Sequence, residues 1–172
     1  MNRRNVLKGL SILPLAGAAT VISQDSQAQV KQERQAWMPK KQVTRKSNSG
    51  NNPAAPPSVV SGCIRSGHLL FLSGIGGWYA ERRAEPGDIK IQINSALTTM
   101  KEVLEEAGSS MANVLKVHMT VAEPNQNIAA LNEVYRGFFP DSPPVRSYTG
   151  CGVDQMGRDG ILVQIDCIAY VD

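Results

Sequence analysis

Apolar residues recur at helical spacing in two segments of the chain. Over 88–107 they stand at three- or four-residue intervals and are followed by a glycine, which predicts an amphipathic helix. The same spacing from about 125 to 139 predicts a second helix. Pro143 and Pro144 then prevent helical continuation and lead directly into a strand.

The remaining apolar positions form short runs of the length typical of strands. Strands are expected at 59–64 and 68–73, at 114–121, directly after Pro144 and at 161–171, and residues 41–45 could add an edge strand. The predicted order is β-β-β-α-β-α-β-β, an α+β fold whose two helices pack on one face of a mostly antiparallel sheet. The opposite face of that sheet would need a partner, which predicts an oligomer.

The first 28 residues have the pattern of an export signal. Arg3 and Arg4 precede an apolar run of 14 residues, which is too short for a comfortable membrane span. Ser26 and Ala28 put small residues at the two positions that a signal peptidase reads. We therefore expect export by the twin-arginine machinery, cleavage after Ala28, and a periplasmic or extracellular protein. An uncleaved N-terminal anchor is the alternative.

Composition divides the chain into a signal peptide (1–28), a polar linker (29–57) and one folded domain (58–172). Residues 1–46 carry nine Lys and Arg against two Asp and Glu, whereas residues 47–172 carry nine against thirteen. The folded body is therefore mildly acidic although the whole chain has a net charge of +3. Because it has no basic stripe, we expect no nucleic-acid partner.

Cysteines and histidines show no metal-ligand spacing. Cys63, Cys151 and Cys167 lack a C-x-x-C pattern, and either one disulfide with a free thiol or three small apolar strand residues would suit them. His68 and His118 are far apart and have no cysteine or carboxylate nearby at ligand spacing. We therefore expect no metal site.

Arg146 is the first candidate for chemistry. It follows the rigid Pro143-Pro144 corner and stands at the start of a predicted strand. A guanidinium held on rigid backbone is well suited to bidentate capture of a carboxylate. Taken alone, a surface arginine or a structural ion pair is the simpler interpretation.

Further segments occur in a characteristic order between residues 58 and 172. They include 67–74 (GHLLFLSG), Asp88 with Gln92, 103–110 (VLEEAGSS), 131–135 (LNEVY), 143–147 (PPVRS) and 165–169 (IDCIA). In this order they resemble the RidA/YjgF family of small imine deaminases. The resemblance implies a chorismate-mutase-like α+β fold and a homotrimer whose clefts lie between subunits.

The resemblance also implies a reaction, the cofactor-free hydrolysis of a reactive 2-imino or enamine acid to a 2-keto acid and ammonia. Such a reaction needs a cation for the carboxylate, an activated water, and polar groups near the imine nitrogen. Arg146 matches the family's carboxylate-binding arginine, and Asn132, Ser73 and Gly74 match positions that line the cleft. Asn132 also lies on the apolar stripe of its helix, so a structural hydrogen bond remains an open interpretation.

Some positions depart from the family pattern. Gln164 stands where deaminase members carry a glutamate thought to activate water, and a neutral amide can orient water but cannot act as a general base. Val60 replaces a common aromatic residue, and Ile75 replaces the glutamine after the Ser-Gly pair. Tyr148, which we place among the substrate-binding residues, stands where some active members have cysteine.

Two functions of different classes follow. The first is an imine deaminase with Arg146 as substrate anchor and a water oriented by Gln164. The second is an exported, non-catalytic binding protein that holds a small carboxylate in the same cleft. A third and weaker interpretation is a chaperone-like or structural trimer.

Overall fold

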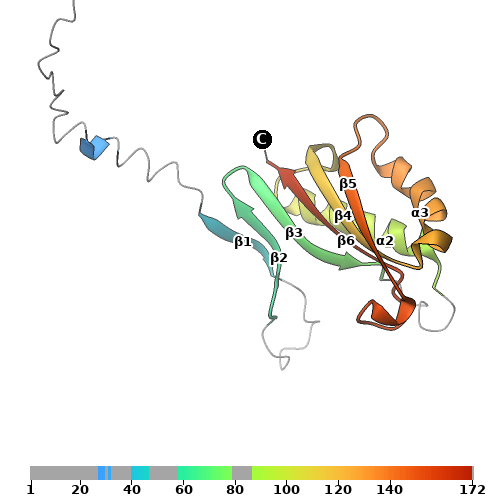
Figure 1. Cartoon of the computed structure of the whole chain (residues 1–172). Coiled ribbons are helices and arrows are strands. Elements are labelled where there is room, and N and C mark those ends of the chain that lie inside the picture. The colour runs from blue at the N-terminus through green and yellow to red at the C-terminus, as the bar shows by residue number, and fades with distance from the viewer. Residues whose placement is uncertain (1–26, 30, 32–39, 47–57, 79–86, 172) are drawn as a thin grey trace, which may run out of the picture. The chain divides into compact units, whose positions relative to one another are not determined.

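A computed structural model describes residues 27–29, 31, 40–46, 58–78 and 87–171 of the 172-residue chain. The predicted signal peptide falls almost entirely outside the described residues. In chain order the elements are β1 (Lys41–Lys46), β2 (Ser61–Ser66), β3 (Leu69–Gly76), α2 (Ile89–Glu106), η2 (Met111–Asn113), β4 (Val114–Ala122), α3 (Pro124–Phe138), β5 (Val145–Cys151), η3 (Val153–Gln155) and β6 (Val163–Tyr170). Apart from the two short 3₁₀ turns, this is the predicted order of strands and helices (Figure 1).

The strands form one six-stranded sheet in the order β1-β2-β3-β6-β4-β5. Every neighbouring pair is antiparallel except β4 and β5, which are parallel and are connected through α3. Strand β1 pairs with β2, so part of the segment predicted as a linker belongs to the sheet. Strand β5, which begins at the proline corner, forms the other edge of the sheet.

Helices α2 and α3 lie on the same face of the sheet (Figure 1). The apolar stripe of α2 supplies fully buried side chains, among them Ile93, Leu97 and Met100. They pack in one core with alternate residues of the central strands, including Met119 and Ile165. The prediction that both helices share one face of a mostly antiparallel sheet is therefore confirmed.

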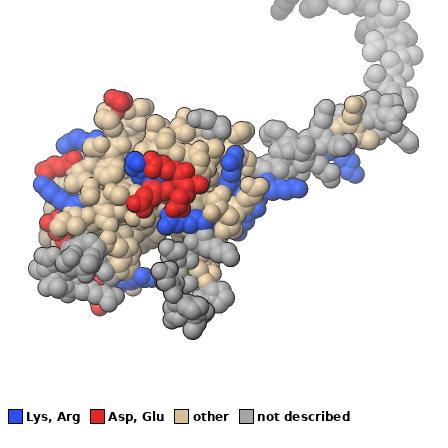
Figure 2. Space-filling view, turned by 180° about the vertical axis from the view of Figure 1, so that it is seen from behind, with Lys and Arg blue, Asp and Glu red and all other residues tan. Residues whose placement is uncertain are grey.

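The other sheet face has no covering layer in the described part of the chain. Phe71 on β3 is 41% exposed, and Leu69 on the same strand is 38% exposed. On the opposite, helix-bearing side, acidic residues gather in one patch with lysines and arginines around it (Figure 2). No continuous basic surface crosses the face that Figure 2 shows.

The three cysteines are free thiols in this fold. Cys63 and Cys167 are fully buried strand residues, and Cys151 is half-buried at the end of β5. Burial raises the pKa of the Cys167 thiol to about 12.

Among the described helices, none combines the length and apolar character needed to span a membrane.

Candidate functional site

The side chain of Arg146 is held by helix α3. On β5, Arg146 pairs with buried Val117 of β4, so its side chain lies on the helix-bearing face of the sheet. One guanidinium nitrogen, Nη2, donates a hydrogen bond to Asn132 Oδ1 at 2.7 Å. The guanidinium carbon lies 4.5 Å from the centre of the Tyr135 ring, which is a cation–π contact. Asn132 and Tyr135 stand three residues apart on α3 and therefore present neighbouring side chains.

These residues line a cleft of about 330 Å³, the anchor pocket, together with Arg136, Pro143 and Pro144. Among the described residues Arg146 makes no ion pair, because the four salt bridges involve other side chains. The interpretation of Arg146 as a structural ion pair thus fails for the described part of the chain. A half-buried guanidinium held by an amide and a ring retains N–H donors for an anion.

Tyr135 contributes an aromatic ring to the lining of the anchor pocket. Its side chain is buried, and burial raises the pKa of its phenol to about 12, with the nearby positive charge of Arg146 acting in the opposite direction. The phenolic oxygen has no hydrogen-bond partner among the described residues. The phenol is therefore neutral at physiological pH.

Gly74 and Gln164 come together elsewhere, on the neighbouring strands β3 and β6. Ser73 precedes Gly74 on β3, but it lines neither the anchor pocket nor the cleft described next. A Cβ atom at Gly74 would overlap the amide nitrogen of Gln164, so the glutamine side chain lies directly across this glycine. A second cleft, of about 370 Å³, lies beside it. We call this cleft the glutamine pocket, and its lining consists of Gly74, Gly76, Trp78, Met156, Gly157, Arg158, Ile161 and Gln164.

The anchor pocket and the glutamine pocket do not meet within one chain. They share no lining residue. Gln164 alternates with buried Val163 and Ile165 on β6, so its side chain points to the uncovered sheet face, away from Arg146. Tyr148 pairs with Met119, is 50% exposed and lines neither pocket.

Some residues of these pockets were not assigned a role from the sequence. Tyr135 could have been found, since it follows Asn132 by one helical turn and precedes the proline corner. Trp78 and Arg158 gave no signal, because the segments around them have neither helical nor strand periodicity. They meet across the glutamine pocket, with the guanidinium carbon of Arg158 4.8 Å from the centre of the Trp78 ring.

His118 has neighbours that its position in the sequence did not reveal. Its Nδ1 lies 3.2 Å from Asp166 Oδ2, and its Nε2 lies 3.2 Å from Thr149 Oγ1, on the uncovered sheet face. These contacts tie together β4, β5 and β6. Within the described ranges, no group of three or more histidine, cysteine or acidic side chains is arranged to hold a metal ion.

Comparison with known proteins decides the family. Residues 50–171 match the family model described as Endoribonuclease L-PSP. This chain belongs to the RidA/YjgF family. Its RidA/YjgF domain is 34% identical to a RutC family protein of Pyrococcus horikoshii over 120 residues, covering 69% of this chain and 92% of that one. It is also 33% identical to the mitochondrial protein mmf2 of Schizosaccharomyces pombe, covering 62% of this chain and 82% of that one.

Solved structures of other proteins have the same fold. A member of the YjgF/YER057c/UK114 family from Mycobacterium tuberculosis superposes with a TM-score of 0.62 at 25% identity, covering 77% of this chain and all of that one. A protein of unknown function from Pseudomonas aeruginosa gives a TM-score of 0.65 at 25% identity, covering 78% of this chain and 95% of that one. The predicted family and α+β fold are thus confirmed.

Proposed function

We propose that this chain hydrolyses reactive 2-imino or enamine acids to 2-keto acids and ammonia, in clefts between the subunits of a homotrimer. The observation that carries the proposal is the state of Arg146. Its guanidinium is half-buried, held by Asn132 and Tyr135, and has no carboxylate partner among the described residues. A cation prepared in this way supports binding of a ligand carboxylate.

The separation of the two pockets supports an inter-subunit cleft. Arg146 lies on edge strand β5, whereas Gly74 and Gln164 line the other pocket, on β3 and β6. One copy would supply the anchor pocket and a neighbouring copy the glutamine pocket. An uncovered sheet face with exposed Phe71 gives the copies a surface to bury against one another.

In this cleft Arg146 binds the substrate carboxylate and so fixes the adjacent imine carbon. The Gln164 amide and Ser73 hold a water over that carbon. The water oxygen bonds to carbon, its protons pass to nitrogen, and the carbon–nitrogen bond then breaks to release ammonia and leave the keto group. Water adds and ammonia leaves, so the reaction needs no redox cofactor.

The second candidate is an exported binding protein that holds a small carboxylate without turning it over. The specific observation that favours it is Gln164, whose neutral amide supplies no general base. Both candidates include export directed by the twin-arginine pattern at Arg3 and Arg4. Mass spectrometry of the envelope fraction should then find an N-terminus near Gln29, whereas an intact Met1 in the cytoplasm would contradict export.

One assay separates these candidates. Keto-acid release from freshly generated 2-aminoacrylate or 2-iminobutyrate is measured with wild type, Arg146→Ala and Arg146→Lys. Loss of the charge-assisted pair should cost roughly 2–5 kcal/mol of binding, and lysine should rescue little because it lacks the two-pronged fork. No release by wild type, with carboxylate binding intact, favours the binding protein. Release and binding that are both unchanged in Arg146→Ala would refute the role of Arg146.

A further inference from the structure

The glutamine pocket holds a second cation that the proposed reaction does not use. Arg158 lies between the left-handed glycines Gly157 and Gly160, in the loop that precedes β6. It lines the pocket beside Gln164, and no acidic residue is among the lining residues. Arg158 forms none of the four ion pairs of the described residues. Its positive charge is therefore available to a ligand.

Trp78 sets the orientation of this guanidinium. The guanidinium carbon of Arg158 lies 4.8 Å from the ring centre, so the cation sits over the indole face. Stacking uses the flat face of a guanidinium and leaves its N–H donors free in the plane to take a carboxylate with two hydrogen bonds. The ring itself folds back over β3, where a Cβ at Gly76 would approach Trp78 Nε1 to 2.8 Å.

Helix α2 anchors both sides of this arrangement. Ser95 Oγ donates a hydrogen bond to the carbonyl of Trp78. Gln92 is fully buried, donates through Nε2 to the carbonyl of Gly160, and accepts at Oε1 from the backbone N–H of Leu162 at 2.7 Å. The tryptophan and the loop that carries Arg158 are thus attached to the same two turns of one rigid helix. A site whose residues are attached to a rigid helix is pre-organised for ligand binding.

The glutamine pocket also has room for more than a water molecule. Its volume of about 370 Å³ reaches the range of small-molecule sites, roughly 300–1,000 Å³, before a second copy adds its anchor pocket. The absence of side chains at Gly74 and Gly76 adds to this volume, because a Cβ atom at these positions would overlap Gln164 and Trp78 respectively.

From these contacts we infer that the ligand is a dicarboxylate, held at its 2-keto or 2-imino end by Arg146 and at its distal carboxylate by Arg158. This inference rests on the proposed inter-subunit cleft, and it names the substrate class. A monocarboxylate uses only Arg146, whereas a dicarboxylate spans both cations. The preference arises from two guanidinium groups on different subunits, Arg146 held by α3 and exposed Arg158 held over the Trp78 ring.

The test measures binding of freshly dissolved keto-acid probes to the mature wild-type protein by calorimetry. The probes are 2-oxobutanoate, with one carboxylate, and oxaloacetate and 2-oxoglutarate, with two carboxylates at different spacings. We expect at least one dicarboxylate to bind about 10- to 100-fold more tightly than 2-oxobutanoate, the range that a charged hydrogen-bonded contact supplies. Equal affinity for all three probes would overturn the inference.

Three variants locate the effect. Arg158→Ala should remove the dicarboxylate advantage while changing 2-oxobutanoate affinity by no more than about twofold, and Arg158→Glu should weaken dicarboxylates further through repulsion. Lys101→Ala, which removes the same charge from an exposed pair with Glu105 on α2, should change neither affinity. A dicarboxylate advantage that survives in Arg158→Ala would overturn the inference.

The proposed function is judged separately by Arg146→Ala. That variant should lose affinity for all three probes. If it does so while Arg158→Ala changes nothing, the dicarboxylate inference fails and the proposed anchor stands. If Arg146→Ala leaves 2-oxobutanoate affinity unchanged, the proposed anchor fails, and the inference that rests on it fails as well.

Discussion

At the scale of single residues, Arg146 depends on two neighbours for its orientation. Asn132 fixes one of its nitrogens, and Tyr135 supports its flat face. Both come from α3, and the Pro143-Pro144 corner lies in the connection between α3 and β5. A long, flexible side chain therefore loses much of its freedom before a ligand arrives, which reduces the entropy cost of binding.

Gln164 gives the most discriminating single substitution. If a missing base limits hydrolysis, Gln164→Glu should raise the rate of keto-acid release at neutral pH, by about 10²-fold if the full general-base contribution returns. The amide and the carboxylate have nearly the same shape, so packing against Gly74 should change little. The rate is compared with that of wild type in the 2-iminobutyrate assay. An unchanged rate with intact carboxylate binding would show that water activation is not the limiting step.

Tyr135 should govern part of the pH dependence of stability. Burial raises the pKa of its phenol from 10.0 to about 12, so between these values the unfolded chain has lost a proton that the native chain retains. The unfolded state then binds fewer protons, and the free energy of unfolding falls as pH rises through this interval. Tyr135→Phe should make that fall shallower in urea melts recorded between pH 9 and 11.5.

The same variant tests the phenolic oxygen. Because this oxygen has no partner among the described residues, Tyr135→Phe should keep or raise stability at pH 7, by up to about 1 kcal/mol. Tyr135→Leu, which also removes the ring beneath Arg146, is the matched comparison and should destabilise the protein. A strongly destabilised Tyr135→Phe would mean that the hydroxyl has a partner in the assembled protein.

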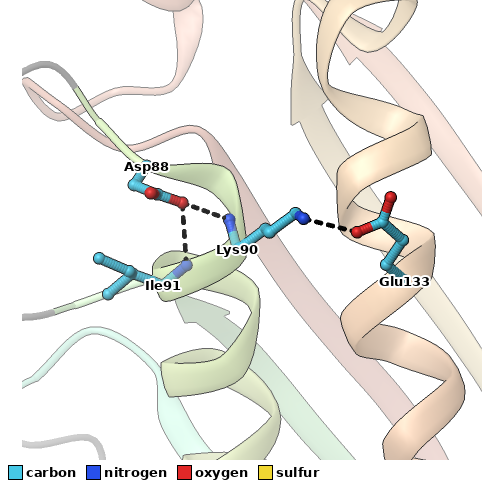
Figure 3. Close-up of polar contacts among 4 residues, drawn as sticks. All are labelled: Asp88, Lys90, Ile91 and Glu133. Carbon is cyan, nitrogen blue, oxygen red and sulfur yellow. Dashed lines mark hydrogen bonds and ion pairs between the residues drawn. The ribbon is translucent and has the colours of Figure 1, made fainter.

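At the scale of elements, α2 is the scaffold of the molecule. Asp88 caps its N-terminus by accepting hydrogen bonds from the backbone N–H groups of Lys90 and Ile91 at 2.8 and 3.2 Å (Figure 3). The side chain of Lys90 pairs with Glu133 of α3, both being exposed. The inner surface fills the core and, through Gln92 and Ser95, holds the loops of the glutamine pocket.

The cap and the ion pair should differ in their contribution to stability. Asp88→Ala should lower the free energy of unfolding by about 1 kcal/mol, because it leaves two N–H groups of the first turn without an acceptor. Lys90→Ala is the control, since it retains the backbone N–H and removes only an exposed ion pair, and it should change stability little. Urea melts of the two variants provide the measurement. No loss of stability in Asp88→Ala would contradict the capping role.

The elements show where sequence patterns were sufficient. The apolar stripe of α2 and the proline corner after α3 predicted helices within one or two residues of their observed ends, since burial of one face imposes the 3.6-residue period. The same patterns could not predict that Arg146 and Gln164 point to opposite faces of the sheet. That separation depends on the strand order β3-β6-β4-β5 and its register, which are set by contacts between residues far apart in sequence. The loop that carries Arg158 has no periodic pattern of apolar residues, and it is held by the hydrogen bond from Gln92 to the carbonyl of Gly160.

At the scale of the whole molecule, the central question is whether one cleft is built from two chains. Each chain carries one anchor pocket and one glutamine pocket, and these share no residue. Light scattering at micromolar concentration should give the mass of a trimer, because burial of exposed apolar residues on the uncovered sheet face, such as Leu69 and Phe71, favours association. A monomer mass would contradict the assembly and with it the shared cleft.

A shared cleft also predicts complementation between two defective variants. Arg146→Ala removes the anchor, and Gly74→Leu puts a side chain where Gln164 lies, so each trimer alone should be defective in binding. The two variants are mixed one to one, unfolded and refolded together. Each cleft then takes its anchor pocket from one subunit and its glutamine pocket from another, and either subunit is equally likely to be either variant. About a quarter of the clefts then receive two intact halves, and about a quarter of wild-type binding capacity should return. If each chain built its own site, no intact site would form and the mixture would stay as defective as its parents. Refolding each variant alone before mixing is the control, and it should restore nothing as long as the trimers do not exchange subunits.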